Sequence, residues 1–430
     1  IGWVTIIVNL IIGLYYNAII SWAAFYIYSS FKNPIPWISC NNTWNVNCNS
    51  SSESEPAQQF FENKLFNKHK APEDVLTPQS ELVISLFCTY LILYLCVFKG
   101  TKSLGKNHSL ENYKKYTMIE YVVSIIYKMA LNPVAWITSL LPYVVLILLF
   151  SYALNLPHAV DGIIFFVTPN LKTLQSFQVW IDAASQIFFS MGLGVGVHIT
   201  FASYNPRNSP ILSNCCYTML ANCFTSIFSG FVVFAYLGHF SGGKDIKNEN
   251  GDHYGMVMII YSAVLSRFKY PQVFCVLFFT MILSLGIDSS FGALEALIAA
   301  ILDYFKNFFN RFKYSREIVT AVTLTFYFAI SIPLTCPIGL LLISLMDEIV
   351  CTVTLLLIGL LECLVIGWIY GAYQLTDNLK EMTGRKIWIG FAITIKFICP
   401  TILTIIILTL FQHEDNEDKL IKISSSTKNI

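Results

Sequence analysis

The stretch IGWVTIIVNLIIGLYYNAIISWAAFYIYSSF, from Ile1 to Phe31, contains no Asp, Glu, Lys or Arg. A helix needs about 20 mostly apolar residues to cross the roughly 30 Å hydrocarbon core of a bilayer, so this stretch is long enough to span one. The apolar region of a secretory leader is only about 7–15 residues long and follows basic residues. We therefore predict a transmembrane helix here. Because the chain opens with Ile1 directly into this helix, we expect the chain to be a fragment.

The composition of the whole chain agrees with a membrane protein. Of its 430 residues, 55% are hydrophobic and 12% are charged, whereas a soluble globular protein has about 25% charged residues. A soluble fold needs charge to cover its surface, so this composition excludes a soluble enzyme, a disordered scaffold and a secreted disulfide-rich mini-domain. The net charge of +1 gives no indication of nucleic-acid binding. We predict an all-α polytopic membrane protein.

Nine apolar segments are long enough to be membrane spans. They cover 2–31, 82–98, 134–156, 173–203, 212–240, 272–302, 317–335, 338–372 and 387–411. A shorter apolar patch at 117–131 carries Glu120 and Lys128, so we predict an interfacial segment or part of an inserted loop there. The predicted organisation is a first span over 1–31, a polar loop over 32–80, a membrane core over 81–411 and a polar tail over 412–430.

Basic residues follow every second span, and the positive-inside rule turns this pattern into an orientation. They stand at Lys99, Lys102, Lys106, Lys114, Lys115, Arg207, Lys306, Arg311, Lys313, Arg316, Lys380, Arg385 and Lys386. If the spans alternate, these residues are all cytoplasmic. The 32–80 loop and the 412–430 tail are then extracellular.

The 32–80 loop carries independent signs of an extracellular location. It contains Asn-x-Ser/Thr glycosylation sequons at Asn41 and Asn49 and two cysteines, Cys40 and Cys48. Glycans and disulfides belong to the oxidising side of the membrane. We predict glycosylation at both asparagines and a disulfide between the two cysteines, with a pair of free thiols as the alternative.

The fourth span contains an unusual concentration of glycine. Gly192, Gly194 and Gly196 follow Ser190 at its centre. Glycine is a poor helix former, and discontinuous helices in transporters use such breaks to present backbone carbonyls and half-helix ends to ions and substrates. We predict a broken helix, with a continuous helix that packs through a small-residue face as the alternative.

The sixth span carries charge and hydroxyl groups at its centre, at Asp288, Ser289 and Ser290. A carboxylate with hydroxyl and carbonyl oxygens is the ligand chemistry that small hard cations prefer. Glu295 lies two helical turns further on and is expected on the same face. The alternative is a carboxylate hydrogen-bonded to a neighbouring helix for packing specificity.

Other spans also contain polar residues, which are costly in hydrocarbon and usually face a cavity or one another. Asn222, Thr225 and Ser226 share one helix face, where they either hold an anion or bridge helices. Tyr15, Tyr16 and Asn17 interrupt the first span and are expected to line a cavity. Charged residues stand at Asp347 and Glu348 in the eighth span and at Lys396 in the last. The long stem of Lys396 allows its charge to reach the interface, so we assign it no function.

Four motifs resemble the neurotransmitter:sodium symporter family. They are QVWIDAASQIFFSMG at Gln178–Gly192, SYN at Ser203–Asn205, PWISCNNTWNVNC at Pro36–Cys48 and GIDSSFGALEA at Gly286–Ala296. The likeness covers Ile1 to about Phe411 and is greatest to the biogenic-amine carriers. It implies part of a LeuT-type fold, which consists of two inverted five-helix repeats.

The resemblance also implies that parts of the family's architecture lie outside this chain. Aligned by the four motifs, the chain begins at the family's third helix and stops after its eleventh, without the first, second and twelfth. Residues 107–133 form an insertion where the family has almost none, and we expect it to come from translated intervening sequence or a gene-prediction error.

The resemblance assigns roles to individual residues in this sequence. The sodium sites are implied to use Leu285, Asp288, Ser289, Ser190 and Asn222. The chloride site is implied to use Gln186, Ser190, Asn222 and Ser226. The substrate pocket is implied to include Ile12, Tyr16, Phe189 and Ser290, and the gates Asp347 on the outside and Asp303 with Tyr204 on the inside.

The function implied is symport of a small neurotransmitter-like amine or amino acid across the plasma membrane, coupled to Na⁺ and Cl⁻, by alternating access and without an organic cofactor. The alternative is a truncated family member that does not transport. The partners expected are the small-molecule substrate and the lipid bilayer, with homo-oligomerisation left open. We do not expect an enzyme, because the intramembrane acids lack a paired nucleophile motif.

Overall fold

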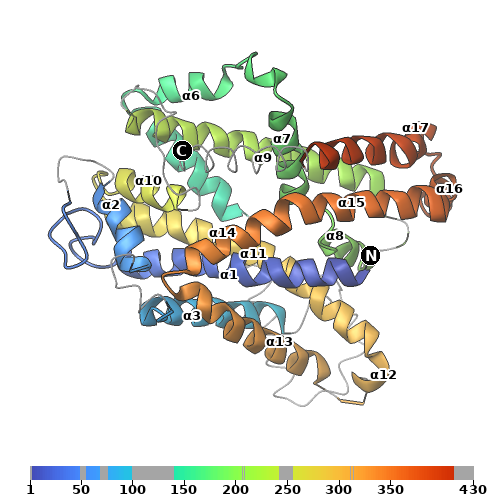
Figure 1. The fold of residues 1–430 in the computed structure, drawn as a ribbon, viewed down its shortest axis with the longest axis horizontal. Helices are drawn as coiled ribbons and strands as arrows, with labels where there is room; N and C mark the ends of the chain where they lie inside the picture. Colours follow the sequence, from blue (N-terminus) through green and yellow to red (C-terminus); the bar gives the residue numbers. More distant parts are fainter. Residues whose placement is uncertain are drawn as a thin grey trace, which may run out of the picture. The chain divides into compact units, whose positions relative to one another are not determined.

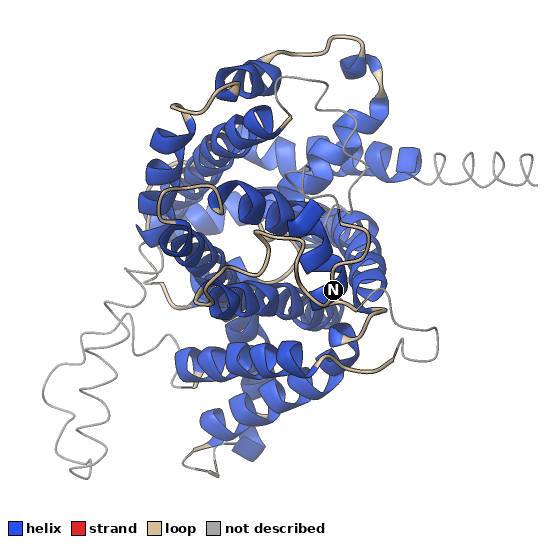
Figure 2. Ribbon diagram, turned by 90° about the vertical axis from the view of Figure 1, so that its left-hand side faces the viewer, coloured by secondary structure: helices blue, strands red, loops and turns tan. Residues whose placement is uncertain are grey.

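The computed structural model describes residues 2–48, 55–67, 76–98, 140–205, 207, 209–241, 255–309, 311–312 and 314–410. Every regular element in these ranges is a helix, as Figure 2 shows in blue. The predicted insertion at 107–133, the sequon asparagine Asn49 and the 412–430 tail lie outside the described residues.

Figure 1 labels the longer helices along the chain. The first half contains α1 (Gly2–Ser30), α2 (Glu55–Gln59), η1 (Phe60–Leu65), α3 (Ser80–Val97), a helix at Leu140–Ala153, α6 (Ala159–Val167), η4 (Thr173–Gln175), α7 (Phe177–Ser190) and α8 (Val197–Ser203). The second half contains α9 (Ile211–Phe240), α10 (Met256–Leu265), α11 (Pro271–Tyr304), α12 (Lys306–Phe309), α13 (Ser315–Ser331), η6 (Ile332–Thr335), α14 (Gly339–Asp347), η7 (Glu348–Thr354), α15 (Leu355–Leu364), η8 (Val365–Gly371), α16 (Ala372–Thr383), α17 (Ile389–Ile393) and η9 (Thr394–Ile398), after which the last helix runs on to Leu410.

Seven helices of the described residues are long and apolar enough to cross a membrane. They are Gly2–Ser30, Ser80–Val97, Ile211–His239, Pro271–Tyr304, Ser315–Thr335, Gly339–Thr383 and Ile389–Leu410, and each coincides with a predicted span. Within the predicted span 134–156, the structure describes a shorter apolar helix that begins at Leu140. The predicted span 173–203 is divided between α7 and α8. The sequence did not predict the short apolar helices α6 and α10, because neither is long enough for a span.

The helix from Gly339 to Thr383 is longer than a bilayer requires. Its 45 residues correspond to about 68 Å of helix, more than twice the thickness of the hydrocarbon core. The backbone leaves the helical region at Gly371, where φ is +100°, and the polar segment α16 follows. The predicted span ended at 372, so hydropathy located the point at which the apolar part ends and the backbone leaves the helical region.

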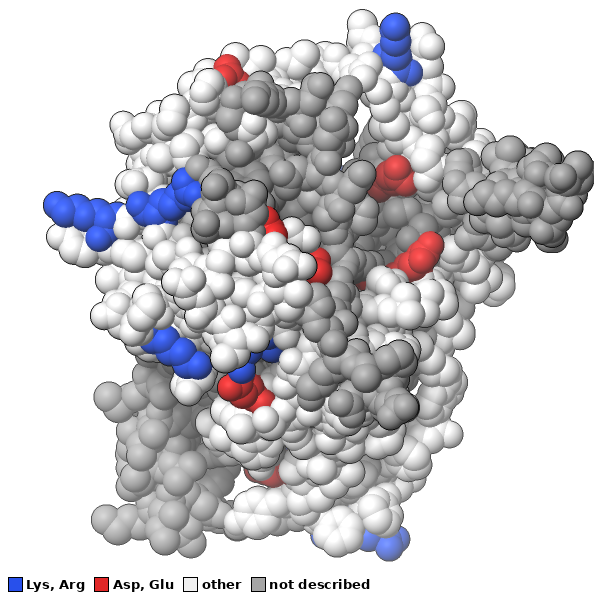
Figure 3. All heavy atoms as spheres, turned by 60° about the vertical axis from the view of Figure 1, so that its left-hand side comes forward, with Lys and Arg blue, Asp and Glu red and all other residues white. Residues whose placement is uncertain are grey.

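The surface of the described chain is rich in apolar side chains. Large hydrophobic residues are exposed along most of the spans, and Ile369 is the most exposed of them at 81%. Figure 3 shows a face on which charged residues are few among uncharged ones. Apolar surface of this extent is stable in contact with lipid, which agrees with the membrane protein predicted from composition.

The chain divides into two compact units, and each is described by itself. Unit 1 comprises Ile1–Asn9, Pro169–Phe224 and Asp347–Ile430, and unit 2 comprises Leu10–Thr168 and Thr225–Met346. In unit 1 the last helix packs its apolar side chains on α7 and α15. This core consists of Ile181, Leu356, Leu403, Ile406, Ile407 and Leu410.

Aromatic rings form the core of unit 2 beneath the 32–80 loop. Tyr26 of α1 lies 5.1 Å from Trp37, 5.3 Å from Phe60 and 4.6 Å from Phe279 of α11, measured between ring centroids. Each of these four rings is fully buried. Trp37 therefore fixes the start of the loop against the membrane helices.

The loop contains the disulfide that the sequence predicted, between Cys40 and Cys48, whose Cα atoms are 5.6 Å apart. The side chain of Gln59 accepts a hydrogen bond from the Val46 amide (2.9 Å) and donates one to the Val46 carbonyl (3.0 Å), so the disulfide-closed turn is also attached to α2. Glycosylation of Asn41, which lies inside this turn, stays a prediction.

Candidate ion and substrate sites

The helix break predicted in the fourth span is present in unit 1. Helix α7 ends at Ser190 and α8 begins at Val197, and Gly192, Gly194 and Gly196 between them have φ values of +61°, +74° and +81°. Residues other than glycine rarely adopt this left-handed region, so three glycines in alternate positions allow the chain to leave the helix here. The alternative of a continuous helix with a small-residue face is wrong.

Two side chains satisfy backbone carbonyls that the break removes from the helical hydrogen-bond pattern. The His198 ring lies with Nε2 2.5 Å from the Met191 carbonyl, and because a carbonyl only accepts, Nε2 carries the proton. Asn9 of α1 donates from Nδ2 to the Val195 carbonyl at 3.3 Å. These bonds hold the break open in one conformation, which the sequence did not predict.

Ser190 and Asn222 form a hydrogen-bonded pair beside the break. The Ser190 hydroxyl lies 3.2 Å from Oδ1 and 3.0 Å from Nδ2 of the Asn222 amide. The pair offers oxygen atoms to a cation and O–H and N–H groups to an anion. The structure therefore brings together the two residues that the sequence placed in both the sodium and the chloride site.

The other residues predicted for the unit 1 sites and the chloride site lie on or directly after α7, α8 and α9. Gln186 is exposed and lies one turn before Ser190 on α7. Phe189 is half-buried, and its backbone carbonyl accepts a hydrogen bond of 2.9 Å from the Gly192 amide. Ser226 is exposed one turn after Asn222 on α9, although it belongs to unit 2. Tyr204 follows the end of α8.

The gate residues belong to different units. Asp347 is the last residue of α14, where the helix passes into the π-helical turn η7, and it lies in unit 1. Asp303 lies near the end of α11 in unit 2, whereas Tyr204 lies in unit 1. The pairing of Asp303 with Tyr204 stays a prediction.

In unit 2, the residues predicted for the second sodium site lie along one turn of α11. Asp288 and Ser289 are both exposed. The Ser289 hydroxyl donates to the Leu285 carbonyl (3.2 Å) and is also hydrogen-bonded to Tyr16 of α1. The turn thus presents a carboxylate, a hydroxyl and a carbonyl oxygen within one segment, which is a ligand set suited to a small cation.

Ser290, which the sequence placed in the substrate pocket, faces a different environment from its neighbours. It is 3% exposed and donates a hydrogen bond of 2.7 Å to Oδ1 of Asn17, which is fully buried. Asn17 in turn donates to the Gly13 carbonyl (2.7 Å) and is hydrogen-bonded to Tyr90 of α3. Tyr15, expected to line a cavity, is also buried.

The network around Asn17 continues to α13. The Tyr90 hydroxyl lies 3.0 Å from that of Ser331, which donates to the Leu14 carbonyl at 3.3 Å. Four helices, α1, α3, α11 and α13, are therefore joined by buried polar contacts. The Tyr-Tyr-Asn interruption in the first span was a visible signal, but its partners could not be identified from sequence.

Glu295 and Asp288, expected on one helix face, lie in different environments. The Glu295 carboxylate is fully buried and forms an ion pair with Arg316 at the start of α13, while Asp288 is exposed. The two acids share a helix face, so their different exposure depends on what packs against α11 at each level. Glu295 is therefore a carboxylate that joins two helices, the arrangement that the sequence analysis considered as the alternative for Asp288.

The sequence profile of the Sodium:neurotransmitter symporter family matches residues 1–133 and 126–419. This chain belongs to that family. The two matched stretches overlap at 126–133, inside the segment predicted to be an insertion. Members of the family are multi-pass plasma-membrane transporters and not enzymes, which agrees with the helices and exposed apolar surface described above.

The relatives of this chain in the symporter family are named after different substrates. The chain is 31% identical over 428 residues to the sodium-dependent serotonin transporter of Drosophila melanogaster, 32% over 425 residues to the sodium-dependent dopamine transporter of Bos taurus, and 31% over 404 residues to the creatine transporter of Torpedo marmorata. These matches cover 96%, 95% and 90% of this chain. The chain spans 64%, 57% and 62% of the length of those relatives.

Proposed function

We propose that this chain forms the ion- and substrate-binding core of a sodium-coupled symporter for a small amine or amino-acid derivative, operating by alternating access. The observation that carries the proposal is the broken α7–α8 helix with the Ser190–Asn222 pair at its edge. Broken helices beside neutral oxygen ligands are how secondary transporters bind ions and substrate near the bilayer midplane.

The sodium gradient supplies the energy in this proposal. One Na⁺ that moves down a membrane potential of 100 mV releases about 2.3 kcal/mol. That energy maintains a roughly fortyfold concentration gradient of an uncharged substrate. Asp288, Ser289 and the Leu285 carbonyl are the proposed ligands in unit 2, and Ser190 and Asn222 are the proposed ligands in unit 1.

Chloride is proposed at the donor groups around the same pair, from Gln186 and Ser190 on α7 and Asn222 and Ser226 on α9. Each of these side chains carries an O–H or N–H donor, and none carries a charge. A neutral donor set binds an anion without fixing a permanent charge in the membrane, which would be costly in the empty transporter. The anion then balances the charge of the sodium ions.

The residues proposed to bind substrate are Ile12, Tyr16 and Ser290 in unit 2 and Phe189 in unit 1. Aromatic rings attract a cationic amine or guanidinium group through their negative faces. Serotonin, dopamine and creatine, the compounds in the relatives' names, all carry such a group. We infer a substrate of this chemical class.

The first test is uptake of radiolabelled serotonin, dopamine and creatine, and of a wider amine and amino-acid panel, by cells that express the protein from its full-length transcript. Sodium is replaced by N-methylglucamine in parallel, and surface protein is measured by biotinylation. We expect at least one substrate to be taken up only in sodium. A protein that reaches the surface and moves none of the panel would refute the proposed function.

Asp288→Asn tests the sodium site within this assay. We expect loss of sodium-dependent uptake at unchanged surface level, because the variant removes the charge that attracts the cation. Asp161→Asn is the matched control, since Asp161 is an exposed carboxylate paired with His158 on α6. Uptake by Asp288→Asn that keeps its sodium dependence would remove the assignment.

A second pair of variants separates the two ions. Ser190→Ala is expected to raise the half-saturating concentrations of both sodium and chloride, because the hydroxyl is proposed in both sites. Gln186→Ala is expected to raise that of chloride alone. If Ser190→Ala changed only one of the two concentrations, the shared role of the pair would be wrong.

A further inference from the structure

Lys396 in the last helix of unit 1 is surrounded by aromatic rings. Its ammonium nitrogen lies 5.2 Å from the ring centre of Trp368 and 5.6 Å from those of Tyr373 and Phe397. The Trp368 indole donates to the Lys396 carbonyl at 2.8 Å, which fixes the largest ring beside the cation. Among the described residues, no carboxylate pairs with Lys396. Within the part of the chain that the structure describes, a positive charge is therefore held at this place without an acidic partner.

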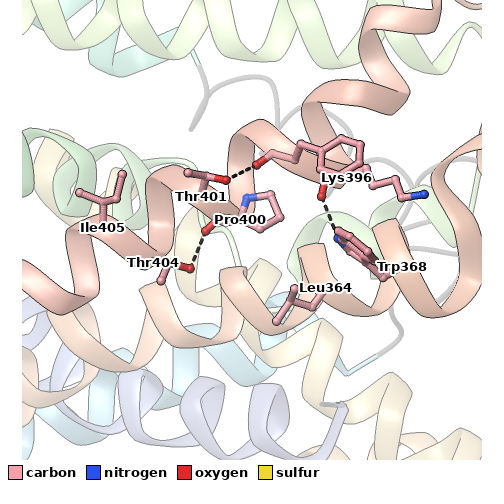
Figure 4. Close-up of a pocket in the computed structure, with 8 residues that line it drawn as sticks. Leu364, Trp368, Lys396, Pro400, Thr401, Thr404 and Ile405 are labelled. Carbon is pink, nitrogen blue, oxygen red and sulfur yellow. Dashed lines mark hydrogen bonds between the residues drawn. The ribbon is translucent and has the colours of Figure 1, made fainter.

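A groove of about 320 Å³ begins at this cation. Figure 4 shows Lys396 and Trp368 at one end of it and Ile405 at the other. The hydroxyls of Thr401 and Thr404, which also line it, donate to carbonyls of their own helix, at 2.7 Å each. Their hydrogen-bonding capacity is thus directed at the backbone, so the groove is apolar along its length and cationic at one end.

The dimensions of the groove match one leaflet of a bilayer. From Lys396 to Ile405 the helix rises about 14 Å, close to half of the roughly 30 Å hydrocarbon core. Lys396 lies seven residues after the start of the helix at Ile389, and thus about 10 Å along it. The lysine stem can carry its charge over part of that distance toward the interface.

We propose that this groove binds an anionic phospholipid, with one acyl chain between the Leu364–Trp368 segment and the last helix and the headgroup phosphate at Lys396. The inference is independent of the transport function proposed above. Charge complementarity selects a net-anionic lipid, because the cation has no acidic partner among the residues that the structure describes. The basic residues Lys380, Arg385 and Lys386 place this end of the helix on the predicted cytoplasmic side, where anionic lipids are concentrated.

The test uses native mass spectrometry of the purified full chain with equimolar phosphatidylserine and phosphatidylcholine of identical acyl chains. We expect phosphatidylserine adducts to exceed phosphatidylcholine adducts about fivefold, the selectivity that one interfacial lysine supplies. Lys396→Gln should bring the ratio close to one, and Lys396→Arg should keep it. Lys380→Gln, which removes an exposed charge outside the groove, is the matched control and should also keep it.

Equal binding of the two lipids by the wild-type chain, or a preference that survives Lys396→Gln, would overturn the proposal. A second measurement on the wild-type chain covers the case in which Lys396→Gln fails to fold. A phosphatidylserine with a photoreactive diazirine in its acyl chain should label peptides from 364–368 and 397–405. Labelling that maps elsewhere, or that is absent because protein covers the groove, would also refute it.

Discussion

Arg316→Met is expected to destabilise the protein strongly through the buried acid that it leaves behind. The Glu295 side chain is fully buried, and that of Arg316 is 21% exposed. Methionine retains much of the apolar stem of arginine but offers no positive charge. Removing one partner of a buried ion pair costs about 3–5 kcal/mol, because the remaining charge has lost both water and its counter-ion.

The exposures of the two side chains predict an asymmetry between single variants. Arg316 retains some contact with solvent and a flexible stem, so Glu295→Leu leaves a cation that can turn toward water or headgroups. We expect Arg316→Met to cost about 3 kcal/mol, roughly a hundredfold in the folding equilibrium, and Glu295→Leu to cost less. The double variant should be closer to the wild type than Arg316→Met, because apolar pairs often replace buried ion pairs without loss.

Fluorescence-detected size-exclusion chromatography after heating provides the assay, with the full chain carrying a fluorescent tag in detergent. Heating of a membrane protein is irreversible, so the midpoints rank the variants rather than yield free energies. Arg385→Met, which removes an exposed arginine, controls for loss of charge. The reasoning is refuted if Arg316→Met melts with the wild type, or if the double variant is no more stable than Arg316→Met.

Three further predictions follow from individual contacts. Gly194→Ala should lower the melting midpoint, since φ of +74° costs a side chain about 1–2 kcal/mol; an unchanged midpoint would contradict the break. Ser290→Ala should lower the stability of the fold by about 1 kcal/mol, because the buried amide oxygen of Asn17 loses a hydrogen-bond donor. The loss should also appear as a lower melting midpoint. Cys363 and Cys399 are in side-chain contact, so mild oxidation should join them in a disulfide that peptide mass spectrometry detects and Cys363→Ser abolishes.

Properties that depend on a few neighbouring residues could be predicted from the sequence. Seven spans matched because hydropathy over about 20 residues is itself the physical requirement for crossing a bilayer. The break after Ser190 matched because the three glycines permit backbone angles that other residues avoid. The disulfide between Cys40 and Cys48 closes a short loop, in which no distant part of the chain is needed to bring the thiols together.

Properties that depend on which helices meet could not be predicted in the same way. Periodicity placed Glu295 on the face of Asp288, but it could not show that Glu295 is buried against Arg316 while Asp288 is exposed. Asn17 and Ser290 are 273 residues apart, and each alone is as compatible with a water-filled cavity as with a buried contact. A helical pattern defines the direction of a side chain, whereas its partner is set by packing.

The Ser190–Asn222 pair offers a physical reason why sodium and chloride could be coupled at one place. In the pair as observed, the hydroxyl and the amide satisfy each other. A cation that took the Asn222 oxygen and the Ser190 oxygen as ligands would turn the hydroxyl proton away from the metal, and the proton would then be available to an anion on the opposite side. The amide would act likewise, with its oxygen toward the cation and its NH₂ toward the anion. Each ion would thereby improve the site of the other without backbone movement, as reciprocal linkage requires. Under this hypothesis Ser190→Ala weakens the binding of both ions, and a variant that weakened only one would show that the two sites are separate.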